Sequence, residues 1–114
     1  CRRMRNGMIE QVGGTREWYL NDRLHRTDGP ALEFADGSRI WYVNGKRHRT
    51  DGPAVEWTDG DREWYVNDQP HRTDGPAVEY VNGERYWFLN GHEYNEDEFQ
   101  VEVVLQEWGL TTNA

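Results

Sequence analysis

The chain has 114 residues and a formal net charge of −8, with 21 acidic residues against 13 lysines and arginines. That length holds one domain, and with no run of 18 apolar residues we expect no membrane contact. Direct nucleic-acid binding is disfavoured, because it needs a basic surface that displaces counterions from the phosphates. The one cysteine, Cys1, permits no internal disulfide, so we expect a cytoplasmic protein.

A repeat of 23 residues dominates the sequence. The heptapeptide His-Arg-Thr-Asp-Gly-Pro-Ala begins at His25, His48 and His71, and tryptophan recurs in register at positions 18, 41, 64 and 87. A unit of this size cannot bury its own apolar side, so successive units must stack. Four units can be counted. The first carries residues 2–8 in place of the heptapeptide, and the last departs from the pattern after Gly91.

Each unit has the local signals of two strands. In the second unit, residues 31–34 and 39–43 favour strands, and Asp36-Gly37 between them predicts a two-residue type I′ turn. A second turn is expected at Asn44-Gly45, after which the chain returns over residues 46–49 into the next unit. The prediction is a mostly β fold over residues 1–94: a single-layer antiparallel β-meander of four hairpin units, each advancing about 10 Å.

The predicted turn sets the register and therefore the two faces of the sheet. One face, the predicted core, collects the four periodic tryptophans and Ile9, Leu20, Leu32, Val43, Val55, Val66, Val78 and Leu89. On this face the arginines Arg39, Arg62 and Arg85 are expected opposite Phe34, Trp57 and Tyr80, where they could form cation–π contacts.

Residues 95–114 are predicted to be a capping helix and tail of the same domain. Asn95 can cap the helix, with Glu98 in capping-box position. An apolar stripe at helical spacing follows, formed by Val101, Val104, Leu105 and Trp108. An extra strand is the alternative, because apolar residues also alternate from Val101 to Leu105. Either element would cover the last repeat.

The motif Trp-Tyr-x-Asn-Gly/Asp followed by His-Arg-Thr-Asp-Gly-Pro-Ala resembles the MORN-like repeats, over about residues 8–91. The heptapeptide variant is similar to repeats in proteins of bacteriophages and large DNA viruses. The resemblance implies an elongated meander that binds proteins, with lipid contact proposed for some eukaryotic members. The chain lacks the usual Tyr-Glu-Gly-Glu-Trp core of that family.

The His-x-x-Asp pattern inside the heptapeptide does not predict catalysis. His25, His48 and His71 should lie about 10 Å apart along the stack, too far to share a metal ion whose bonds to nitrogen are about 2 Å. We expect neither catalytic residues nor a metal or other cofactor. Asp28, Asp51 and Asp74 are expected to hold the bend through bonds to the backbone, and the histidines to pack on neighbouring rings.

The predicted register also places Glu56 opposite Glu63, and Glu10 opposite Glu17, which is unfavourable unless a cation compensates. A neighbouring arginine or histidine could supply that cation, or a partner could. The same face carries a row of aromatic residues, and such rows suit the centre of an interface. The candidate binding residues are Tyr19, Tyr42, Tyr65, Phe88, Glu56 and Glu63.

These features favour a non-enzymatic protein-binding module. Given the viral resemblance, its most concrete form is a phage-encoded inhibitor of a bacterial defence complex such as a CRISPR effector, acting in the host cytoplasm. Two alternatives stay open: sequestration of a small nucleotide between repeats, or a structural component of a virus. A homodimer could form through a sheet edge or an apolar face.

Overall fold

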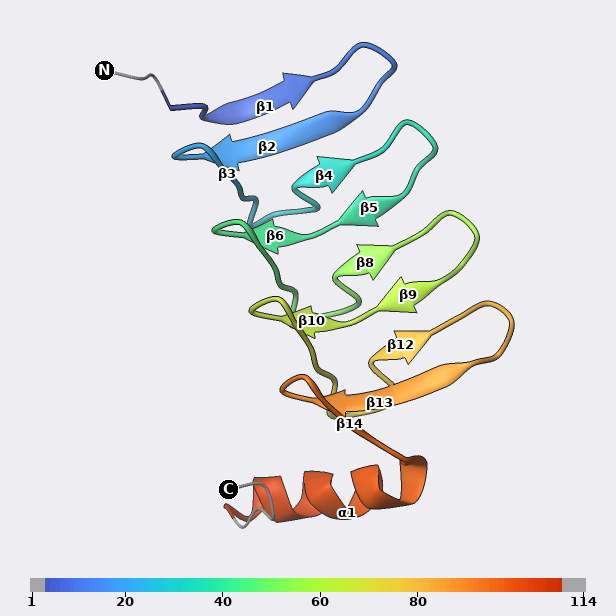
Figure 1. Cartoon of the computed structure of the whole chain (residues 1–114). Coiled ribbons are helices and arrows are strands. Elements are labelled where there is room, and N and C mark those ends of the chain that lie inside the picture. Colours follow the sequence, from blue (N-terminus) through green and yellow to red (C-terminus); the bar gives the residue numbers. More distant parts are fainter. Residues whose placement is uncertain (1–3, 110–114) are drawn as a thin grey trace.

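The computed structural model describes residues 4–109 and shows a mostly β protein. In this range antiparallel hairpins follow one another along one axis, and one helix closes the C-terminal end (Figure 1). The molecule is a flat slab with principal extents of 48 × 36 × 19 Å. The predicted fold, a meander of hairpins with a C-terminal capping helix, is confirmed.

The main sheet joins all four units. The strands in chain order are β1 Gly7–Glu10, β2 Arg16–Leu20, β3 Arg23–Leu24, β4 Leu32–Glu33, β5 Arg39–Ile40, β6 Tyr42–Val43, β7 Lys46–Arg47, β8 Val55–Glu56, β9 Arg62–Glu63, β10 Tyr65–Val66, β11 Gln69–Pro70, β12 Val78–Glu79, β13 Arg85–Leu89 and β14 His92–Tyr94. Their order is β1-β2-β4-β5-β8-β9-β12-β13-β14, with β3 on β2, while β6–β7 and β10–β11 are separate pairs. Each unit therefore has a large hairpin and a small one, and the small ones form a column at one edge (Figure 1).

The turns of the small hairpins are as predicted. Asn44 and Gly45 have φ values of +52° and +78°, and Val43 pairs with Lys46 directly across them. In the first unit Asn21 and Asp22 have φ values of +50° and +67°. Asparagine and aspartate tolerate this left-handed region, so a two-residue turn with both residues at positive φ can form.

The turns of the large hairpins differ from the prediction. Phe34 N donates to Ser38 O at 2.9 Å and Gly37 N to Phe34 O at 2.9 Å, which encloses a three-residue loop, 35–37. Gly37 has a φ of +96°, whereas Asp36 has no positive φ. This is a type I turn followed by a glycine bulge, a geometry that an Asp-Gly pair suits as well as it suits a type I′ turn.

The longer loop shifts the cross-strand register by one residue. Val55 pairs with Glu63 and Glu56 with Arg62, and in the first hairpin Glu10 pairs with Arg16. The predicted oppositions of Glu56 to Glu63, and of Glu10 to Glu17, are therefore wrong. Since side chains alternate along a strand, the shift also changes which residues share a face.

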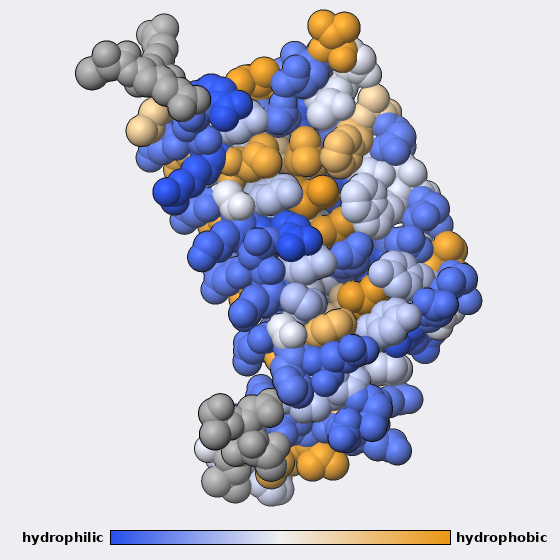
Figure 2. Space-filling view, in the orientation of Figure 1, coloured by the Kyte–Doolittle hydropathy of each residue, from blue (hydrophilic) through white to orange (hydrophobic). Residues whose placement is uncertain are grey.

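One face, here called the valine face, carries Val55, Glu63 and Tyr65 in the third unit; the other, the tryptophan face, carries Glu56 and Trp64. The predicted core face is therefore divided: Val43 and Val66 lie beside Trp41 and Trp64 as predicted, but the row that contains Val55 lies on the opposite face. The aliphatic row is buried, with exposed fractions of 7% for Ile40, 2% for Val55 and 8% for Val78, whereas the periodic tryptophans are half-buried. In Figure 2, separate apolar bands cross the visible face with hydrophilic side chains between them.

The predicted cation–π partners are also different. Each of the arginines Arg39, Arg62 and Arg85 pairs across the strands with a glutamate, in turn Glu33, Glu56 and Glu79. Other arginines occupy the aromatic rings. Arg26, Arg49 and Arg72 lie over Trp18, Trp41 and Trp64, and Arg5 and Arg47 lie over Tyr19 and Tyr65.

The helix α1 spans Glu96–Glu107 and begins with the predicted capping box between Asn95 and Glu98, so the alternative of an extra strand is wrong. It covers the last repeat with Phe99 and Glu102, which are buried. Of the predicted apolar stripe, Val101, Val104 and Trp108 point the other way, with Trp108 71% exposed, and Leu105 is half-buried. With 12 residues, α1 is too short to cross a bilayer, and the remainder of 4–109 holds no other helix that could.

Replacing Phe99 by alanine should reduce the free energy of unfolding by about 3 kcal/mol, because it empties a buried ring position. Trp108→Ala, the matched truncation of an exposed ring, should change it by less than about 0.5 kcal/mol. Urea unfolding followed by fluorescence measures both. A larger loss for Trp108→Ala than for Phe99→Ala would show that the stripe faces inward.

Candidate functional site

The arginine of the heptapeptide connects each unit to the next. The Cζ atom of Arg49 lies 3.8 Å from the centroid of the Trp41 ring in the preceding unit. Its backbone N–H donates to the carbonyl of Tyr65 in its own unit at 3.1 Å. Its Nη1 donates to Pro53 O at 3.0 Å and lies 3.4 Å from Glu56. One side chain thus binds the strand before the loop and the strand after it.

Each loop aspartate binds the same arginine. The Nε–H groups of Arg26, Arg49 and Arg72 donate to Asp28, Asp51 and Asp74 at 2.9, 2.9 and 2.8 Å. This bond lowers the pKa of all three carboxyl groups. The bond to arginine is the larger interaction of each carboxyl group and orients the guanidinium, while a backbone bond of the predicted kind also lowers the pKa.

The loop glycine and alanine leave room for this packing. A Cβ added at Gly52 would lie 3.0 Å from Cζ of Arg49, and at Gly29 and Gly75 the corresponding distance is 2.9 Å. The alanine that ends each heptapeptide, at positions 31, 54 and 77, is fully buried. Larger residues at these positions would displace the arginine or the neighbouring strand.

The histidines also connect successive units. Nδ1 of His25 accepts a hydrogen bond from the backbone N–H of Asn44 at 3.0 Å, and His48 and His71 do the same for Asn67 and Asn90. The contact that the structure shows for each imidazole is this bond, not the predicted packing on a ring. An acceptor Nδ1 must be unprotonated, so the neutral imidazole fits the fold. Burial lowers the pKa of His71.

The loop threonines differ from the other polar loop residues, because their side chains form no hydrogen bond within the described residues. Thr27, Thr50 and Thr73 are exposed, and their hydroxyl groups have no hydrogen-bond partner among the residues that the structure describes. Every other residue type of the heptapeptide makes a contact or meets a limit on space that the fold requires. The threonine is thus the polar side chain of the heptapeptide whose hydrogen-bonding group the fold does not use within residues 4–109.

Two adjoining grooves lie between consecutive heptapeptide loops on the tryptophan face. The first, of about 650 Å³, has walls formed by residues 26–30 and 48–51 and a floor of Trp41 and Val43. The second, of about 740 Å³, has walls formed by residues 49–52 and 71–74 and a floor of Trp64 and Val66. Because the middle loop forms a wall of both, the grooves repeat with the period of the stack.

The charges in these grooves are arranged by depth. The carboxylates of Asp28, Asp51 and Asp74 have exposed fractions of 80 to 83%, whereas the arginines that bind them are 19 to 24% exposed. A partner approaching the grooves meets carboxylates and threonine hydroxyls first. The guanidinium groups are already occupied by ring faces and by oxygen atoms.

The predicted binding residues lie mostly on the opposite, valine face and are engaged within the protein. Tyr65 donates its hydroxyl to Glu63 at 2.7 Å, and Arg47 lies 4.0 Å from the centroid of its ring. Burial, followed by the bond to Glu63, raises the pKa of Tyr65 to about 12. Trp57 Nε1 donates to the same carboxylate at 3.0 Å. Both oxygens of the Glu63 carboxylate are therefore hydrogen-bonded within the protein.

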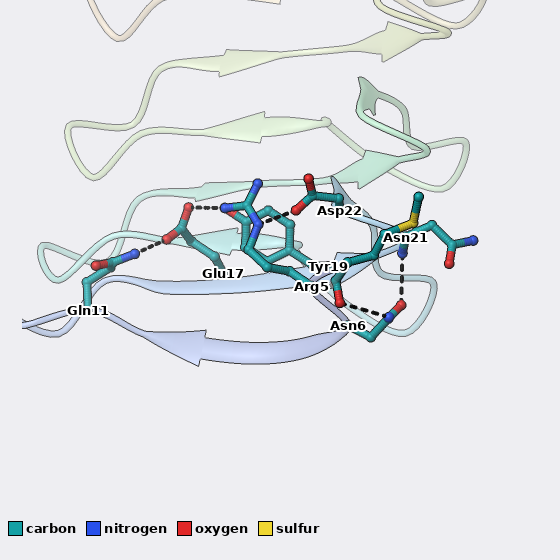
Figure 3. A network of polar contacts seen from close by, with 8 residues as sticks. Arg5, Asn6, Gln11, Glu17, Tyr19, Asn21 and Asp22 are labelled. Atoms are coloured by element: carbon teal, nitrogen blue, oxygen red, sulfur yellow. Dashed lines mark hydrogen bonds and ion pairs between the residues drawn. The ribbon is translucent and has the colours of Figure 1, made fainter. Parts of the chain in front are cut away.

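The first unit builds the same cluster from different residues (Figure 3). Tyr19 donates to Glu17 at 2.7 Å, and Arg5 covers the Tyr19 ring while binding Asp22. Gln11 donates to Glu17, as Trp57 does to Glu63. Residues ahead of β1 thus replace the return strand that a preceding repeat would supply.

The second and fourth units use an apolar version of the cluster. Tyr42 and Phe88 hold the ring position, but Ile40 and Tyr86 replace the glutamate, and Leu24 and Pro70 stand where Arg47 stands. Tyr42, Tyr65 and Phe88 therefore form a row whose members differ in polarity. The sixth predicted residue, Glu56, belongs to the tryptophan face, where it binds Arg39 at 3.2 Å and Arg49 at 3.4 Å.

The three loop histidines do not converge on one centre. The three imidazoles belong to separate loops, and each binds a different turn. Within residues 4–109 no three His, Cys, Asp or Glu side chains are placed to hold a metal ion. Sequence reasoning recognised the loop motif and kept open a ligand between repeats, but it did not identify the loop residues that line the grooves, since these depend on how consecutive loops are spaced.

No protein-family model, curated protein or solved structure matches this chain. The resemblance to MORN-like repeats stays a prediction.

Gly52→Ala should reduce the free energy of unfolding by about 1–2 kcal/mol, because the new methyl group meets the Arg49 guanidinium. In an Arg49→Ala background the same substitution should cost less than about 0.5 kcal/mol, since the obstruction is gone. Urea unfolding of the four variants tests this. Equal costs in both backgrounds would show that the glycine is needed for another reason.

Acidification should destabilise the protein partly through His71. Its folded pKa is lowered from an unfolded value of about 6.5, so the unfolded state binds more protons and stability falls as pH drops below about 6.5. In His71→Asn the side-chain oxygen can accept the same bond without titrating, as Asn6 does for Asn21. The loss of unfolding free energy between pH 7.5 and 5.5 should be smaller for this variant. An equal loss would exclude a contribution from His71.

Proposed function

We propose that this protein is a non-enzymatic protein-binding repeat module that uses the tryptophan face. The observation that carries the proposal is the pair of adjoining grooves with identical walls. A translated stack presents the same groups at regular intervals, which suits recognition of an extended surface rather than of one reacting atom.

The composition of the grooves supports a protein partner. Each floor has one tryptophan and one valine, surrounded by polar side chains, as interface centres commonly have. The loops that form the walls are held by arginine stacking and backbone bonds, so little ordering is required on binding. The valine face is a weaker candidate, because the hydroxyls of Tyr19 and Tyr65 already donate to glutamates of the protein and arginines cover their rings.

The finer proposal, an inhibitor encoded by a phage and directed at a bacterial defence complex, is supported by the similarity of the heptapeptide to viral repeats. A small nucleotide is the second candidate, because the groove volumes are within the range of small-molecule sites. The exposed carboxylates at the rim argue against it, since they would repel phosphate groups.

Two threonine substitutions test whether a partner binds in the grooves or elsewhere on the surface. Thr50→Arg places a larger side chain in a wall shared by both grooves and should reduce capture of a protein from host-cell lysate at least tenfold. Thr58→Arg makes the same change at an exposed threonine on the large-hairpin edge and should leave capture unchanged. Equal effects of the two substitutions, or a thermal shift with cyclic nucleotides that only Thr50→Arg abolishes, would contradict protein binding in the grooves.

A further inference from the structure

The loop threonine has kept its identity where other exposed positions have changed. At the exposed positions 35, 58 and 81 the three units carry Ala, Thr and Val, and at 46, 69 and 92 they carry Lys, Gln and His. The threonine is the same in all three loops although its hydroxyl has no hydrogen-bond partner within residues 4–109. The fold gives no reason for this identity, and a contact with another molecule would supply one.

The three threonines line the two grooves. Thr27 and Thr50 belong to the walls of the first, and Thr50 and Thr73 to the walls of the second. Beside each threonine stands the loop aspartate, whose Oδ1 binds arginine and whose carboxylate is at least 80% exposed. A hydroxyl and an exposed carboxylate thus recur together at every loop.

This surface favours a particular partner: we propose that it binds an extended peptide segment in the polyproline II conformation with a basic residue at every third position. The inference rests on the proposed function and names its partner class. Each basic side chain would enter one groove beside an aspartate, and the peptide backbone would pass over the threonine row.

Spacing supports this conformation. Two strands per unit give a translation of about 10 Å per repeat. A polyproline II helix rises about 3.1 Å per residue and turns once in three, so every third side chain returns to the same side after about 9.3 Å. A β-strand returns to one side every second residue, after about 6.7 Å, and would miss the next groove.

Hydrogen bonding separates this conformation from an α-helix, whose residues i and i+7 are also about 10.5 Å apart. The backbone of an α-helix is saturated by its own hydrogen bonds, whereas polyproline II leaves its carbonyl and N–H groups free. A threonine hydroxyl can donate or accept. A row of such hydroxyls is useful only to a partner with free backbone groups.

The exposed charges of the loops favour a basic side chain in the partner. The outermost groups of each loop are carboxylates with exposed fractions of at least 80%, and the arginines lie deeper and are engaged. A basic side chain can form an ion pair with the carboxylate of each loop, whereas an acidic side chain would be repelled by it. On the groove floors Val43 and Val66, with the parts of Trp41 and Trp64 that the arginines leave uncovered, offer apolar contact to the aliphatic part of a lysine or to a proline ring.

Synthetic peptides test the proposal directly. The first is four repeats of Lys-Pro-Pro; the second has the same composition with lysine at every second position of its first eight residues; the third is an α-helical peptide with lysine at every seventh position. Fluorescence anisotropy with the full chain at 50 and 150 mM salt should show the first binding at least tenfold tighter than the second and third. Similar affinities for the first two, or tighter binding of the helical peptide, would overturn the inference.

Isosteric substitutions provide the matched control. Thr50→Val removes the hydroxyl and keeps the shape, and should weaken binding of the Lys-Pro-Pro peptide at least fivefold. Thr58→Val should leave the affinity unchanged, and an unchanged affinity in Thr50→Val would contradict the role of the threonine row. If Thr50→Arg abolishes capture from lysate while no peptide discriminates, the proposed function stands and this inference fails. If Thr50→Arg leaves capture intact, the proposed function fails as well.

Discussion

The contact on which the rest of this structure depends is the guanidinium of each heptapeptide loop lying flat on the tryptophan of the preceding strand. The distances of 3.8 to 3.9 Å are the same in all three loops. In a single-layer sheet the apolar rings have no second layer to cover them, so the loop arginine takes that place while its polar edge binds aspartate and a proline carbonyl. The loop is thereby held rigidly, and the spacing between loops creates the grooves.

The two ends of the stack show what a unit requires. At the N-terminal end Asn6 accepts a bond from Asn21 N–H as each loop histidine does, and Arg5 covers Tyr19 as Arg47 covers Tyr65. At the C-terminal end the position of the next loop arginine is Asn95, which begins the helix instead. At the first end, other side chains thus supply the backbone hydrogen bond and the ring contact that a neighbouring repeat supplies elsewhere. At the other end the helix covers the last repeat, as the ends of finite repeat arrays require.

The period, the turns of the small hairpins, the meander and the capping box were predictable, because each depends on local residue chemistry. The register was not, since an Asp-Gly pair such as Asp36-Gly37 fits both a two-residue turn and a three-residue loop with a glycine bulge. That one-residue difference moved Glu56 to the other face and divided the predicted core. The helix was predicted correctly, but the side that it turns toward the sheet was not. That side is decided by the packing of Phe99 on the last repeat and not by periodicity alone. The grooves and the unused threonine hydroxyls could be recognised only once every other loop residue had a contact.

The most direct test of this account is a double-mutant cycle between Trp41 and Arg49, with Trp41→Leu, Arg49→Met and the double variant unfolded in urea. If the stacked guanidinium holds the loop to the strand, the coupling free energy should be about 1–2 kcal/mol, and the double variant should be less destabilised than the sum of the single variants. A coupling below about 0.3 kcal/mol would show that ring and guanidinium contribute independently. In that case the loops, and the grooves between them, would be held by something other than this contact.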